Sequence, residues 1–77
     1  MSTPRFKTLD VRPGLLRGEE PFPLIRARAD ELKPGHGLTV IAPFMPAPLI
    51  ELLKSEGFRS TLERRKDGAW SVNFWRE

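Results

Sequence analysis

Residues 58–75 read FRSTLERRKDGAWSVNFW, and this stretch decides the fold because two alternating patterns flank one turn. Phe58 and Leu62 alternate with charged and polar side chains in the first half. Val72 and Phe74 alternate with polar side chains in the second half. A period of two is typical of half-buried strands, and a glycine between two such runs is typical of a hairpin. We therefore predict that the chain closes with an antiparallel β-hairpin.

The length of the turn sets the register of this hairpin. A two-residue turn would pair Glu63 with Val72, which places a charged residue opposite a core side chain. A three-residue loop over residues 66–68, with Gly68 in the left-handed conformation, pairs Leu62 with Val72 instead. We therefore predict the three-residue loop.

Two further strands come earlier in the chain. Residues 6–12 alternate, with Leu9 and Val11 on one face, and residues 38–42 form a short apolar run that suits a central strand. Residues 13–18 contain proline and glycine and are expected to form a loop.

Prolines mark the start of two helices. Pro21 and Pro23 suit the first turn of a helix that ends at residues 33–35, and Pro48 suits a second helix that ends at a left-handed Gly57. The first helix is expected to bury a stripe made of Leu24, Ile25, Ala29 and Leu32. The second is expected to turn inward Leu49, Ile50, Leu52 and Leu53.

The element order is therefore βαβαββ. A crossover between parallel strands is right-handed, which places both helices on one face of the sheet. The fold class predicted is α+β, a two-layer α/β sandwich with a mixed four-stranded sheet. Seventy-seven residues are expected to make a single domain over 1–77, with 1–5 as a flexible N-terminal tail.

The composition limits the chemistry. The chain has no cysteine and one histidine, which argues against disulfides and an ordinary zinc site, and we predict no cofactor. His36 is expected to be exposed in a Gly-His-Gly turn. The chain shows no secretory signal and no membrane-spanning run, so we expect a soluble, cytoplasmic protein.

Three short motifs resemble, in chain order, those of the TusA-like (SirA-like) superfamily of small bacterial sulfur carriers. They are LDVR at residues 9–12, PFPL at 21–24 and LKPG at 32–35. In the carriers a cysteine precedes the Pro-x-Pro helix entrance, where the helix dipole favours a thiolate. Glu20 stands there in this chain, and a carboxylate cannot hold a sulfane sulfur. The resemblance is thus to the cysteine-free branch of uncharacterised domains, and it implies the fold without the persulfide chemistry.

Both helices should begin at the sheet edge where open α/β sheets usually bind ligands. The candidate partner-binding residues at this edge are Glu20, Pro21, Phe22, Pro23, Phe44 and Met45. Glu20 is expected to cap its own helix. Phe44 and Met45 either fold back onto the core or offer a contact surface. The leading hypothesis is a small non-catalytic binding or adaptor domain whose partner is another protein or a second copy.

The alternative hypothesis is an anion or nucleic-acid binder, because the chain has 13 basic residues and only 10 acidic ones. Its candidate residues are Arg12, Arg17, Arg28, Arg64, Arg65, Lys66 and Trp75. The open sheet face is expected to display Phe6, Thr8, Thr39, Ile41, Thr61, Arg65, Asn73 and Trp75, with Trp75 and Arg59 forming a cation–π pair. Arg28 lies on the apolar stripe of its helix, and we expect its stem to cover the core edge while its head reaches a carboxylate.

An enzyme is the third hypothesis. It would use Glu20 as a base beside Arg12 or Arg28, or an Asp10–Glu20 carboxylate pair. The sequence holds no nucleophile motif, metal-ligand set or phosphate-binding loop, so we do not expect an enzyme.

Overall fold

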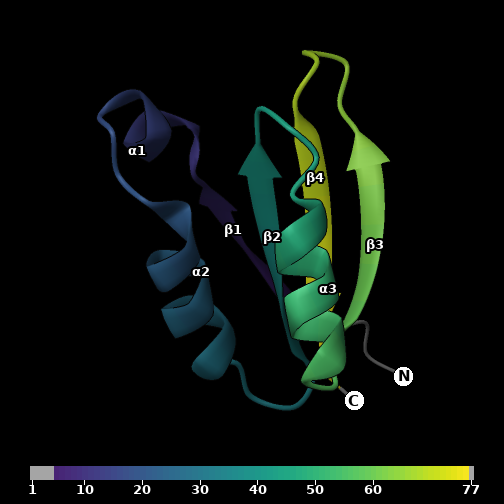
Figure 1. Cartoon of the computed structure of the whole chain (residues 1–77). Helices are drawn as coiled ribbons and strands as arrows, with labels where there is room; N and C mark the ends of the chain where they lie inside the picture. The colour runs from purple at the N-terminus through teal and green to yellow at the C-terminus, as the bar shows by residue number, and fades with distance from the viewer. Residues whose placement is uncertain (1–4, 77) are drawn as a thin grey trace.

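A computed structural model describes residues 5–76 and shows one mixed sheet of four strands. The strands are β1 (Arg5–Asp10), β2 (His36–Ala42), β3 (Arg59–Arg64) and β4 (Trp70–Trp75), and they lie in the order β1-β2-β4-β3 (Figure 1). β1 and β2 are parallel, and the other neighbours are antiparallel. The predicted α+β fold and the central position of the second strand are confirmed. The predicted tail lies outside the described residues, apart from Arg5, which begins β1.

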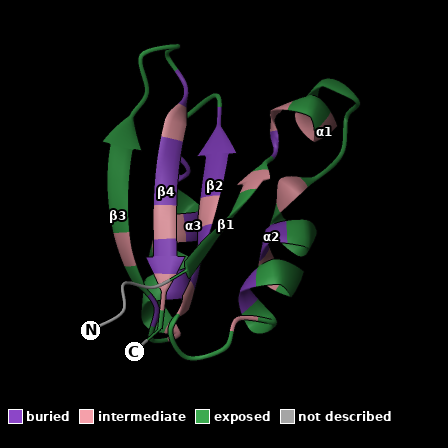
Figure 2. Cartoon of the chain, turned by 180° about the vertical axis from the view of Figure 1, so that it is seen from behind, coloured by how far each residue is buried: buried purple, intermediate pink, exposed green. Residues whose placement is uncertain are grey.

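Two helices cover one face of this sheet and leave the other face open (Figures 1 and 2). They are α2 (Pro21–Asp30) and α3 (Ala47–Ser55). Each follows one of the parallel strands, so both begin at the same edge. Within residues 5–76, no helix is long and apolar enough to cross a membrane.

A short helix, α1 (Arg12–Leu16), replaces the loop that we predicted over residues 13–18. Its N-cap is Val11, and the Arg12 backbone N–H at its start donates a hydrogen bond to Asp10 Oδ1 at 3.0 Å. Pro13 fits the first turn, where a backbone N–H has no helical partner. The prediction of a loop was wrong because a helix of five residues is too short to show a periodic pattern.

The closing hairpin has the register that the alternation predicted. Leu62 pairs with Val72, Ser60 pairs with Phe74, and Gly68 has φ +88°. The Arg65 N–H donates to the Ala69 carbonyl at 2.8 Å, which closes the loop over residues 66–68. The two-residue turn is thereby excluded.

The core lies between the sheet and the two long helices. Its helical side chains are Ile25, Ala29, Leu49 and Leu53, and they pack against Leu38, Val40, Val72 and Phe74 of the sheet. The prediction that Leu24 and Leu52 also face inward was wrong, because both are exposed. A helix in a two-layer fold turns only one stripe to the sheet, and these two leucines lie at its margin.

The open face is partly covered by its own side chains. The ring of Phe6 packs edge-on against Trp75, with the ring centroids 6.1 Å apart. Asn73 links Thr39 and Thr61 across three strands by hydrogen bonds of 2.6 and 3.1 Å. Ile41, which we expected on display here, is buried, and its neighbour in the adjacent strand is Asp10.

Candidate functional site

Large apolar side chains are exposed at the edge where α2 and α3 begin. Phe44 and Met45 precede α3 and keep 49% and 48% of their surface accessible, and Phe22 in the first turn of α2 keeps 45%. The neighbouring Pro46 is buried at the start of α3. The loop is thus anchored by proline, while its two largest apolar side chains remain half in solvent. We call Phe22, Phe44 and Met45 the apolar edge.

Glu20 occupies the N-cap position of α2 but does not cap the helix through its side chain. Its backbone is extended, with φ −81° and ψ 126°, and its carboxylate makes no capping hydrogen bond. The expectation of a side-chain cap was wrong. The reason lies in Pro21 and Pro23, which remove two of the first three N–H groups that a capping carboxylate could accept from.

An ion-pair network ties the end of β1 to the hairpin loop. Arg12 contacts Asp10 at 2.7 Å and Asp67 at 3.1 Å, and Arg65 contacts Asp67 at 3.4 Å. The hydrogen bond from the Arg12 side chain lowers the pKa of Asp10. The hydrogen bond from the Ala69 backbone N–H, followed by that from Arg12, lowers the pKa of Asp67. Arg12 therefore has a structural role, because its ion pairs connect the end of β1 to the hairpin loop.

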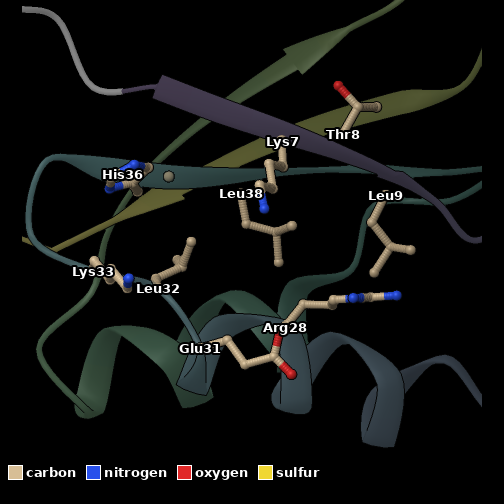
Figure 3. A pocket seen from close by; sticks show the side chains of 10 residues that line it. Lys7, Thr8, Leu9, Arg28, Glu31, Leu32, Lys33, His36 and Leu38 are labelled. Carbon is tan, nitrogen blue, oxygen red and sulfur yellow. The ribbon is translucent and has the colours of Figure 1, made fainter.

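A cavity of about 330 Å³ lies between β1 and α2 (Figure 3). The basic side chains and the histidine that line it are Lys7, Arg28, Lys33 and His36, the one acidic side chain is Glu31, and the apolar ones are Leu9, Leu32 and Leu38. Of these residues, only Arg28 was among the binding candidates predicted from the sequence. Lys7 carried a signal that could have revealed the cavity, because its register opposite Leu38 puts it on the core-facing side of β1.

Two expectations about residues of this cavity were wrong. Arg28 makes no ion pair within the described part of the chain, although we expected it to reach a carboxylate. His36 is half-buried rather than exposed, and its Nδ1 atom is buried without a hydrogen-bond partner in the region from Arg5 to Arg76. His36 is the first residue of β2 and pairs with Arg5 of β1, so it lies within the sheet and not in an exposed turn.

Comparison with protein families matches residues 8–76 to the model described as "Uncharacterized conserved protein (DUF2249)". The chain belongs to this family. No curated protein and no solved structure matches the chain. The DUF2249 match covers every helix and all but the first residues of β1, so the family corresponds to the whole fold described above.

The basic residues of this DUF2249 domain do not form one patch. Arg12 and Arg65 meet at Asp67, whereas Arg17 pairs with Glu19 at 2.8 Å beyond α1. This hydrogen bond raises the pKa of Arg17 and lowers that of Glu19.

The tryptophans near these candidate cations also make contacts within the domain. Arg64 stacks over Trp70 at 5.6 Å from the ring centroid, while Trp75 contacts Phe6. Trp75 lies opposite Arg59 as predicted, and their cation–π pair stays a prediction. Among the candidate cations of the hairpin, Lys66 is exposed at the loop and makes no ion pair with the described residues.

The carboxylates of the DUF2249 domain bear on the enzyme hypothesis. Asp10 and Glu20 both line a cavity of about 90 Å³ between α1 and the start of α2. No hydrogen bond joins these two side chains, and Asp10 is held by Arg12. Residues 5–76 contain no cluster of three potential metal ligands. The Asp10 carboxylate is thus held in an ion pair with Arg12, and the Glu20 carboxylate that lines the same cavity is unpaired among the described residues.

Proposed function

We propose that this domain is a non-catalytic binding or adaptor module that contacts another protein through the apolar edge. The observation that carries the proposal is the near-half exposure of Phe22, Phe44 and Met45 at the edge where both helices begin. Burying such side chains on a partner is the main source of affinity in protein interfaces.

The size of the apolar edge favours a short apolar segment of a different protein over a second copy. Three half-exposed side chains of this size offer roughly 300 Å². A stable interface buries about 800 Å² on each partner. The edge therefore suits a small, transient contact. Anchoring by Pro43 and Pro46 lowers the entropy lost when Phe44 and Met45 are ordered on the partner.

The resemblance to the sulfur carriers supports a binding role of this kind. The Pro-x-Pro entrance that holds the reactive cysteine in the carriers is present at Pro21 and Pro23, with Glu20 at the cysteine position. We infer a carrier-shaped domain whose partner is held without a covalent bond at this place. The carboxylate of Glu20 cannot form a persulfide.

Affinity capture with matched variants tests the proposal. Phe44→Ala and Met45→Ala should each weaken binding of a captured partner at least tenfold, since each removes a buried anchor. Leu52→Ala is the control, because Leu52 is 45% exposed on α3 but lies outside the apolar edge. Unchanged binding in both edge variants would overturn the proposal, as would equal loss in the control. If sedimentation shows that the chain self-associates, the partner is a second copy of this chain and not a different protein.

The alternative, a nucleic-acid or anion binder that uses the hairpin and the open sheet face, has less support. Three of its arginines, Arg12, Arg17 and Arg65, are already in ion pairs. Titration with single-stranded oligonucleotides at low and moderate salt separates the two hypotheses. Tryptophan quenching that weakens steeply with salt would favour the alternative.

A further inference from the structure

The cavity between β1 and α2 gathers basic side chains that have no acidic partner. Lys7, Arg28 and Lys33 all line it, and none makes an ion pair with any residue from Arg5 to Arg76. The one carboxylate in the lining is Glu31. The three cations therefore exceed the single anion by two charges, and all three are exposed, so a ligand can reach them.

The fold explains how a lysine comes to lie between the two layers. Lys7 occupies the core-facing side of β1, opposite Leu38. β1 is the edge strand of the sheet, and α2 covers this end of it (Figure 1). Figure 3 shows Lys7 extending from β1 toward the helix layer, with Arg28 running beneath Leu9. Lys7 is exposed at this edge of the sheet, so its ammonium group is accessible to a charged ligand in the cavity.

The remaining lining adds apolar surface and one unsatisfied polar atom. Leu9, Leu32 and Leu38 form an apolar wall. His36 lines the same cavity, and its Nδ1 atom is buried without a hydrogen bond to the described residues. An unpaired buried nitrogen is unfavourable for the fold.

We propose that this cavity binds a small organic anion, with its phosphate or carboxylate group held by Lys7 and Arg28, while Lys33 adds positive charge at the other end of the cavity (Figure 3). The leucines take the apolar body of the same molecule. The volume of about 330 Å³ falls at the lower end of the range of ligand sites. Guanidinium and ammonium groups suit both kinds of anion. This activity goes beyond the protein contact proposed above, because it uses a different part of the fold.

Nuclear magnetic resonance titration of the whole chain with phenyl phosphate tests the inference. Saturable shifts should centre on the amides of residues 7–9 and 28–38. Benzoate and inorganic phosphate, titrated in parallel, separate carboxylate from phosphate recognition and measure the contribution of the apolar body. Phenol, which lacks the charge, should bind at least tenfold more weakly, since charged hydrogen bonds are lost.

Variants that each remove one positive charge test whether phenyl phosphate binds in the cavity. Arg28→Gln and Lys7→Gln should weaken binding of phenyl phosphate about fivefold or more. Lys54→Gln removes the same charge from an exposed position of α3 and should leave the dissociation constant unchanged. The inference is overturned if neither phenyl phosphate nor benzoate gives saturable shifts at the cavity. Equal weakening in the Lys54 variant overturns it as well, because binding then follows net charge. Should Lys7→Gln unfold, the comparison of Arg28→Gln with Lys54→Gln decides alone.

Discussion

Gly37 determines how the open face of the sheet packs. It pairs with Phe6 on one side and with Trp75 on the other, and a Cβ atom placed on it would overlap the ring of Phe6. The absence of a side chain lets Phe6 lie over the strand and reach Trp75. One glycine thus allows an aromatic contact across three strands.

We expect Gly37→Ala to lower the free energy of unfolding by about 1 kcal/mol, because Phe6 must leave its contact with Trp75. Denaturant unfolding followed by tryptophan fluorescence measures this change. In a Phe6→Ala background the same substitution should cost about zero, since the overlapping ring is gone. An equal cost in both backgrounds would show that Gly37 acts through its backbone.

Asp10 and Asp67 make the stability of the fold depend on pH in the acidic range. Their pKa values are lowered from 3.8, in Asp10 by the Arg12 side chain and in Asp67 first by the Ala69 N–H. A carboxylate with a lowered pKa in the folded state stabilises the fold above its unfolded pKa. That contribution is lost as the pH falls through the folded value.

We therefore expect wild-type stability to fall below about pH 4, and Asp10→Asn to make that fall shallower while lowering stability at pH 7. Denaturant unfolding at pH values from 2.5 to 7 measures both effects. Glu51→Gln, an exposed change on α3, is the control. A variant whose pH curve ran parallel to the wild-type curve would remove Asp10 from this account.

At the scale of elements, α2 and α3 are joined by one arginine. Arg26 of α2 pairs with Glu56, the residue that ends α3, and also with Asp30 one turn along its own helix at 3.5 Å. The Arg26–Glu56 pair is partly buried. It links the middle of α2 to the C-terminal end of α3.

We expect Arg26→Gln to lower the free energy of unfolding by about 1 kcal/mol, at the upper end for an ion pair near the surface. Arg17→Gln serves as the matched control, because its pair with Glu19 is local and well exposed, and it should change stability little. Thermal unfolding of both variants at low and high salt tests this. A smaller effect for Arg26 than for Arg17 would contradict the proposed link.

The elements also show what sequence patterns can predict. The hairpin register followed from the alternation around Leu62 and Val72 with a loop of fixed length, because a slip of one residue would expose the core. The helix α1 could not be found this way, because its five residues are too few to show a periodic pattern. The exposure of Leu24 and Leu52 depends on the angle at which each helix packs, which no local pattern contains.

On the scale of the whole molecule, the sequence located the apolar edge but missed the cavity. Phe44 and Met45 stood out because large apolar residues between prolines are visible in one short segment. The cavity is lined by Lys7 from β1, Arg28 from the last turn of α2 and Lys33 from the segment that follows this helix. These residues meet only once the crossover between the parallel strands is formed, so their grouping comes from tertiary structure.

Photo-crosslinking in cells from single positions tests the central claim, that the apolar edge holds a different protein. The crosslinking side chain replaces Phe44, Leu52 or Trp75 in separate variants of the whole chain. We expect one heterologous adduct from position 44, lost when Met45→Ser is added, and none from positions 52 or 75. Adducts from position 75 or 52 without one from 44 would contradict the claim, and so would an adduct between two copies of this chain.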